Sequence, residues 1–267
     1  MPIKNAGRPS APEAARRLVI LKHLIAKALA SPPPHLLSKQ FQAWTANQQQ
    51  SFQQQADGDR DEFCGILEDR GLWHYLSRRE IQFAQTTMLT RDKGMRIDMC
   101  WRIEAAQCLM WALRIISELP PYDTLASPDI LKMFDVSEPA TFIREASLRP
   151  ESEIDEARSL AELWHWRSRT RQLIEMGKDL SPDAKMLAAG FRTYDDIVRF
   201  TARKSVETGT LPRHLEEDFP ARNKAYRNLT RQEWQEIGSI TVERHFACNW
   251  LSGYAPRNNW DETPTDT

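Results

Sequence analysis

Residues 240–267 read ITVERHFACNWLSGYAPRNNWDETPTDT, and this stretch carries more information about the fold than any other. Its first half is an apolar run with helical spacing that also carries polar groups, namely Glu243, Arg244, His245 and Asn249. Charged groups inside an apolar helix are costly unless they are paired. The sequence therefore predicts that side chains from elsewhere in the chain meet these groups.

The second half of the same stretch is an acidic tail with an aromatic anchor, Trp260. Residues 257–259 are expected to turn the chain, and Asp261, Glu262 and Asp266 then follow with no basic residue among them. Two interpretations are open. The tail packs back across its own helices, which we favour, or it is a peptide that a partner captures through the aromatic anchor and the terminal carboxylate.

Composition limits the class of protein. Of the 267 residues, 41% are hydrophobic and 27% are charged, which allows a sizeable core and argues against general disorder. The net charge of -1 gives no overall field for nucleic acid or anionic membranes, and we expect the protein to bind neither. No apolar run approaches the length of a membrane span. We interpret the four cysteines, which form no CxxC pair, as reduced thiols of a cytoplasmic protein.

Hydrophobic periodicity predicts helices and no paired strands. The expected helices cover roughly residues 10–30, 35–56, 95–118, 152–177, 193–208 and 231–252, with a break at 57–59. The expected fold class is all-α: a single multi-helix globular domain with an extended C-terminal tail packed on the core. Residues 1–59 are expected to form an N-terminal helical segment with a Gln-rich face, and residues 60–267 the main helical domain.

Several short blocks of sequence support a family resemblance. They are WRIEA at 101–105, LMWAL at 109–113, ELP at 118–120, LWHWRSR at 163–169, ERHFACNWL at 243–251, WDE at 260–262 and TDT at 265–267. Together they resemble a bacterial family known as domain of unknown function 4272, over roughly residues 60–267 and most specifically in the C-terminal block. The Gln-rich region lies outside the resemblance, and Cys248 stands where the family usually has Leu. The resemblance implies a mostly helical bacterial protein and no particular activity.

A buried carboxylate is predicted at Glu104, which shares a helical stripe with Trp101 and Cys108. Such a group either pairs with a cation or titrates at raised pH. One hypothesis is an ion-pair network in which Glu104 and Glu243 meet Arg167 and Arg244 and fix the register of the helices. The residues assigned to this network and to the tail are Arg102, His165, Arg167, Arg244, Asn249, Trp260, Asp261 and Asp266.

The other hypothesis is a polar pocket in which Glu104, Glu243 and His245 are catalytic candidates, with His165 joining from another helix. No nucleophile motif, Gly-rich phosphate loop or HExxH motif accompanies them. We expect no metal site, because Glu243 and His245 are two residues apart and project from different sides of a helix. We also expect no cofactor. The expected function is a non-catalytic protein-binding module of an accessory or immunity type. The alternative is a small-molecule-binding or hydrolytic enzyme that uses a Glu/His/Arg pocket, and the oligomeric state is open.

Overall fold

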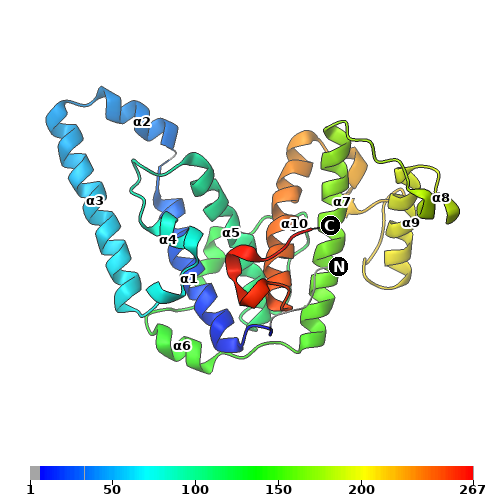
Figure 1. The fold of residues 1–267 in the computed structure, drawn as a ribbon, viewed down its shortest axis with the longest axis horizontal. Helices are drawn as coiled ribbons and strands as arrows, with labels where there is room; N and C mark the ends of the chain where they lie inside the picture. Colours follow the sequence, from blue (N-terminus) through cyan, green and yellow to red (C-terminus); the bar gives the residue numbers. More distant parts are fainter. Residues whose placement is uncertain (1–6, 33, 267) are drawn as a thin grey trace. The chain divides into compact units, whose positions relative to one another are not determined.

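The computed structural model describes residues 7–32 and 34–266, and within them it confirms the all-α fold class (Figure 1). The elements are α1 (Ala11–Ala30), α2 (Pro34–Ala43), α3 (Ala46–Asp69), η1 (Trp73–Tyr75), α4 (Arg78–Ala84), α5 (Lys93–Ala112), η2 (Pro128–Lys132), α6 (Pro139–Glu145), α7 (Glu151–Glu175), α8 (Ala184–Ala188), α9 (Tyr194–Glu207), β1 (Pro220–Ala221), β2 (Lys224–Ala225), η3 (Tyr226–Asn228), α10 (Arg231–Leu251), η4 (Pro256–Asn258) and η5 (Trp260–Glu262). None of these helices is long and apolar enough to cross a membrane.

The chain forms two compact units. Among the described residues, unit 1 takes those of Met1–Leu119, Ala126–Pro150 and Asn249–Pro264. Unit 2 takes those of Pro120–Leu125, Glu151–Cys248 and Thr265–Thr267. The predicted boundary after residue 59 falls inside α3, within unit 1.

Helix α1 begins where the sequence predicts it and supplies much of the core of unit 1. Ser10 is its N-cap: its hydroxyl accepts from the Glu13 backbone, and the Glu13 carboxylate accepts from the Ser10 backbone in return. The helix packs on α5 and α6. Its buried stripe is Ala14, Ala15, Leu18, Val19, Ile20, Leu21, Leu24, Ile25 and Ala28.

The predicted helix over residues 35–56 is wrong in both its continuity and its end. The chain breaks instead at Thr45, between α2 and α3. Thr45 caps α3 with a second reciprocal box, in which Gln48 occupies the third helical position. A capping residue can start a new helix where no proline or glycine is present. The hydrophobic pattern therefore did not reveal the break at Thr45.

The expected break at 57–59 is also wrong, because α3 continues through it to Asp69. Asp57 is held on the helix surface by Gln53, at 3.1 Å, and by Arg60, at 2.8 Å. Gly58 in a helix interior costs only about 1 kcal/mol relative to alanine. Neighbouring helical bonds and these side-chain pairs offset such a cost, so the signal at Gly58 is too weak to end the helix.

Helix α5 ends earlier than the predicted residue 118, at Ala112. Arg114 adopts a φ of 63°, and the backbone N–H of Ile115 returns to the Met110 carbonyl at 2.9 Å. A left-handed residue followed by this long backward bond is the usual way in which a helix terminates. Arg149 reinforces this end, because its guanidinium also donates to the Trp111 carbonyl at 2.8 Å.

Unit 2 is organised around α7 and α10, which approach closely at a glycine. A Cβ added to Gly238 would lie 3.1 Å from the Ser168 hydroxyl, so the small residue permits the close approach. The two-residue strands β1 and β2 pair antiparallel across a turn in which Arg222 and Asn223 have φ values of 50° and 59°. The hydrophobic pattern predicts no paired strands here. A pair this short leaves no run of alternating residues to detect.

Candidate functional site

A buried ion pair lies in unit 2, between Arg167 of α7 and Asp218 of the loop before β1. The guanidinium donates twice to the carboxylate, from Nε and Nη2, both at 2.7 Å. The two side chains are 4% and 0% exposed, so the pair is almost fully removed from water. Bidentate geometry and burial make this the strongest kind of side-chain pair.

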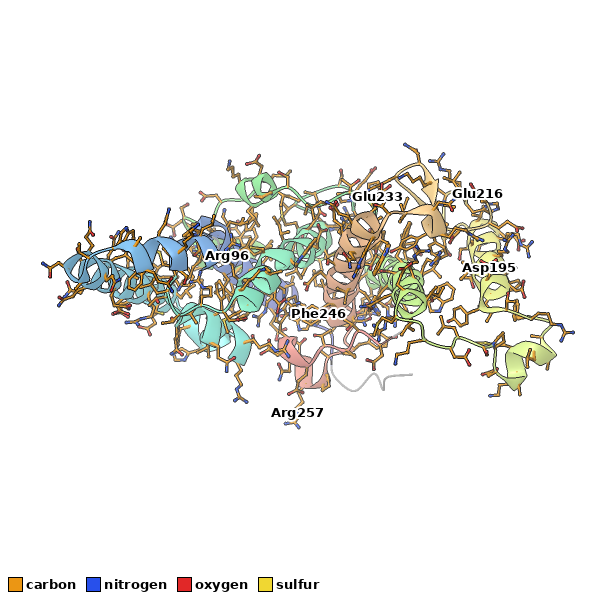
Figure 2. All side chains as sticks on the ribbon, turned by 90° about the horizontal axis from the view of Figure 1, so that it is seen from above. Arg96, Asp195, Glu216, Glu233, Phe246 and Arg257 are labelled. Carbon is orange, nitrogen blue, oxygen red and sulfur yellow. The ribbon has the colours of Figure 1, made fainter. Side chains whose placement is uncertain are left out.

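Asp218 collects further donors. Its carboxylate also accepts from the backbone N–H groups of Phe219, at 2.8 Å, and Arg227, at 2.9 Å. Arg227 also bonds through Nη1 to Asp195 at 3.0 Å, and Figure 2 shows Asp195 on α9. Burial alone would raise the pKa of Asp218, but the Arg167 side chain and the backbone donors hold that pKa below its usual value. The carboxylate is therefore ionised and joins α7 to the β1–β2 region.

Arg244 is a buried residue of unit 2 whose guanidinium binds backbone carbonyls. It is 0% exposed, and its guanidinium donates to three backbone carbonyls: Pro120 at 2.6 Å, Pro121 at 3.2 Å and Thr124 at 2.9 Å. The cation also lies 5.1 Å from the centre of the Tyr122 ring. Arg244 thus fixes the segment 120–125 against α10.

Glu104 is buried in unit 1, as the sequence predicts. It is 0% exposed, and its Oε1 accepts from the backbone N–H of Ala126 at 2.7 Å. Glu243 is half-buried on α10. The carboxylate partner of Arg167 is Asp218, which the sequence analysis did not name, and the wider pairing of Glu104 and Glu243 with Arg244 stays a prediction.

Asp218 left no usable signal in the sequence. It follows Glu216 and Glu217 in an acidic run, and no helical or strand period marks it. Figure 2 shows Glu216 on the loop that follows α9. A bend in the backbone buries the third acidic residue of the run while the first two remain accessible to solvent.

The structure brings His165 and His245 together, as the pocket hypothesis expected. Their Nδ1 atoms lie 3.0 Å apart, and the ring centres 5.2 Å apart. One nitrogen must donate and the other accept, so only one proton lies between the rings. His245 is 0% exposed, whereas His165 is half-buried and lines a cleft.

Protonation of His165 is disfavoured. Burial, and secondarily the positive charge of Arg169, lower its pKa to about 4. At neutral pH the imidazole is therefore uncharged.

We predict a measurable consequence for stability. Because the folded pKa lies below the unfolded value near 6.5, the contribution of His165 is complete above about pH 6.5 and is lost as the pH falls towards 4. Between pH 7 and pH 5 the loss is about 2 kcal/mol. Chemical unfolding at the two pH values should show that His165→Gln removes this part of the pH dependence. An NMR titration of the His165 ring that gave a pKa near 6.5 would contradict the prediction.

The cleft in unit 2 has a volume of about 760 Å³. Helices α7 and α10 form its walls, and the chain contributes two residues from its last segment. The lining residues are His165, Ser168, Arg169, Gln172, Trp234, Gln235, Gly238, Ser239, Val242, Thr265 and Asp266. The lining of the cleft combines one indole ring with several amides and hydroxyls, and such a surface suits a polar ligand.

The catalytic candidates do not line this cleft. Glu104 belongs to unit 1, and neither Glu243 nor His245 is among the lining residues. His165 is the predicted site residue that faces the opening, together with Asp266 of the tail. Trp234 and Gln235 were not predicted as site residues, because a single aromatic or polar position on a helix carries no local signal for a cleft.

The tail up to Pro264 packs on unit 1, as expected. Trp260 is 3% exposed and meets Trp250 edge to face, with ring centres 5.1 Å apart. The guanidinium groups of Arg17 and Arg102 lie 5.2 and 5.8 Å from its ring centre.

Two hydrogen bonds and a turn complete this arrangement. Asp261 accepts from the Arg79 backbone at 3.0 Å, and the Asn249 amide donates to the Pro264 carbonyl at 2.7 Å. The predicted turn is present, since Arg257 and Asn258 have φ values of 51° and 59°. Arg257 is exposed and points outward in Figure 2.

We predict that Trp260→Ala lowers the free energy of unfolding by about 3–5 kcal/mol, because it leaves a large cavity beside Trp250. Urea unfolding of the variant provides the measurement, and Arg257→Ala in the same tail is the exposed control. A variant as stable as the wild type would show that the tail does not contribute to the core of unit 1.

In the part of the chain that the structure describes, no group of three or more His, Cys, Asp or Glu side chains comes together in a way that could hold a metal ion. The four cysteines are free thiols.

Residues 5–187 match the family described as Domain of unknown function (DUF4272). The chain belongs to this family. No curated protein and no solved structure matches the chain. The family match begins at residue 5, so it includes the Gln-rich region, and the expectation that this region lies outside the resemblance is wrong.

The extent of the match divides the candidate site. Helix α7, with His165 and Arg167, lies within the residues that match DUF4272. Asp218, the β1–β2 pair and α10 lie beyond residue 187, and so does the C-terminal block that the sequence analysis took as the most specific part. One wall of the cleft therefore comes from the matched region and the other does not.

Proposed function

We propose that the protein is a non-catalytic protein-binding module, and that the cleft of unit 2 receives an extended segment of its partner. The observation that carries the proposal is that Thr265 and Asp266 already form part of the lining. A piece of non-helical chain therefore lies against α7 and α10 at this place. A surface that accommodates one such segment has the shape to accommodate another.

The chemistry of the lining supports a peptide ligand. Gln172 and Gln235 are exposed amides that can both donate to and accept from a peptide backbone. Trp234, which is 8% exposed, contributes an indole to the lining, and indole is the type of side chain that anchors protein interfaces. The Ser239 hydroxyl bonds weakly to its own helix, at 3.3 Å from the Gln235 carbonyl, and is easily redirected to a ligand.

The buried charges support a non-catalytic role. Glu104 and Arg244 hold backbone groups, and Asp218 is fully surrounded by donors. These side chains hold backbone segments in place, and this is the role expected of a network that fixes the register of the helices. The accessory or immunity type of function, in the bacterial cytoplasm, is part of the same proposal. The free thiols support the compartment, and the family resemblance supports the bacterial source.

A peptide library provides the first test. Random peptides displayed on phage are selected against the purified full-length protein, and the affinity of the enriched peptides is measured. We expect Ser239→Trp, which fills the cleft, to weaken binding at least about tenfold, as the loss of a well-packed contact does. Gln232→Trp is the matched control, because Gln232 is exposed on α10 but does not line the cleft.

Equal binding by the wild type and Ser239→Trp would refute the cleft as the binding site. A second experiment places a photo-crosslinking residue at Gln235 or, as the control, at Gln232. The selected peptides should crosslink from position 235 and not from position 232.

A small polar molecule is the second candidate ligand, because 760 Å³ lies within the range of about 300–1,000 Å³ for small-molecule sites. In a hydrolytic enzyme, His165 would face such a ligand, and His245 would contact the His165 ring on the side away from the ligand. Thermal-shift screening of polar metabolites distinguishes the two candidates. Stabilisation that Ser239→Trp abolishes, without any selected peptide, would favour the small molecule.

A further inference from the structure

The charges around the cleft are distributed unevenly. Among the described residues that line it, Asp266 is the one carboxylate and Arg169 is the one arginine or lysine. The remaining polar lining consists of amides, hydroxyls, an indole and the imidazole of His165. Without Asp266, the described lining would present a cation and several donors with no carboxylate to meet them.

The segment that supplies this carboxylate is held loosely. The last firm attachment of the tail is the hydrogen bond from the Asn249 amide to the Pro264 carbonyl. Beyond it, Thr265 and Asp266 make no hydrogen bond or ion pair in the described part of the chain, and Asp266 is exposed. The hydrogen bonds that hold the tail at Asp261 and Pro264 involve neither residue.

Arg169 is available to a ligand. It is exposed on α7, and its Nη1 donates to the neighbouring Gln172 side chain, which keeps the guanidinium at the cleft. A neutral amide does not neutralise the charge. A carboxylate placed there would gain a charge-assisted bond, which is roughly twice as strong as a bond between neutral groups.

We propose that Thr265 and Asp266 are a built-in, displaceable occupant of the cleft, and that the cleft selects an acidic segment of a partner protein in their place. This inference rests on the proposed peptide-binding function. A tethered segment has an effective concentration on the order of millimolar. A tethered segment whose dissociation constant for the cleft lies several times below that concentration then reduces the apparent affinity of an external peptide severalfold.

The test uses two blocked peptides that differ by one carboxylate. The first has the sequence of residues 262–267, ETPTDT, and the second is ETPTNT, each acetylated and amidated. Binding is measured by calorimetry to the full chain and to a variant that lacks residues 265–267. Because that variant retains Trp260 and Pro264, its melting temperature should match the wild type, which serves as the folding control.

We expect ETPTDT to bind the shortened variant at least about fivefold more tightly than the full chain, as release from a tethered competitor requires. ETPTNT should bind the shortened variant at least about fivefold more weakly than ETPTDT, and Arg169→Gln in that variant should remove this difference. A full-length Asp266→Asn variant should show part of the gain without any truncation.

Three results would overturn the inference. They are no binding of ETPTDT to the shortened variant at millimolar concentration, equal binding of ETPTDT to the full and shortened chains, and equal binding of the two peptides. Failure of the inference can be told from failure of the proposed function. If phage selection yields neutral peptides that Ser239→Trp excludes, the cleft binds peptides but has no preference for acidic ones.

Discussion

Asp218→Asn is expected to lower the free energy of unfolding by about 3–5 kcal/mol, the usual cost of leaving one member of a buried ion pair without its partner. The substitution removes the charge that faces Arg167, whose side chain is only 4% exposed. It also replaces one carboxylate oxygen with an N–H₂ group, and both oxygens now accept hydrogen bonds. Urea unfolding followed by circular dichroism gives the measurement.

Asp195→Asn is the matched control. Asp195 makes the same type of contact with Arg227 as Asp218 does, but its side chain is 51% exposed. An exposed pair contributes less than about 1 kcal/mol. If the two aspartate variants unfolded at the same urea concentration, the Arg167–Asp218 pair would not be a determinant of stability in unit 2.

Glu104→Ala is expected to destabilise the protein by about 3–5 kcal/mol, because a buried carboxylate and its compensating partners are disrupted together. Part of the loss is the Ala126 N–H, which would remain buried without its acceptor at a cost of about 1–3 kcal/mol. The exposed Glu118, just beyond α5, provides the control, and Glu118→Ala should change little.

Glu104→Gln separates charge from hydrogen bonding. The amide oxygen can still accept from Ala126, so a variant of normal stability would show that only this hydrogen bond matters. We expect a loss of about 2–3 kcal/mol instead, because the network hypothesis assigns the carboxylate a buried cationic partner. A wild-type melting temperature for both Glu104 variants would contradict that hypothesis.

Local signals in the sequence were sufficient for several elements. The capping residues Ser10 and Thr193 each begin a helix where the sequence places one, since a cap depends on contacts within a single turn. The burial of Glu104 also followed from the sequence, because its stripe on α5 is apolar. The ends of α3 and α5 were not predicted correctly. Whether a helix ends at a glycine or at a left-handed residue depends on the hydrogen bonds that the neighbouring residues make.

By itself, the sequence determined an all-α fold, the turn before Trp260 and the residue types from which a site could be built. It could do so because hydrophobic period, helix caps and turn residues act over a few positions. Tertiary structure alone decided that Asp218 pairs with Arg167, that His165 faces a cleft and that Thr265 and Asp266 line it. Those contacts join residues far apart in the chain. Their identity depends on how the backbone of unit 2 packs, and no local pattern encodes that information.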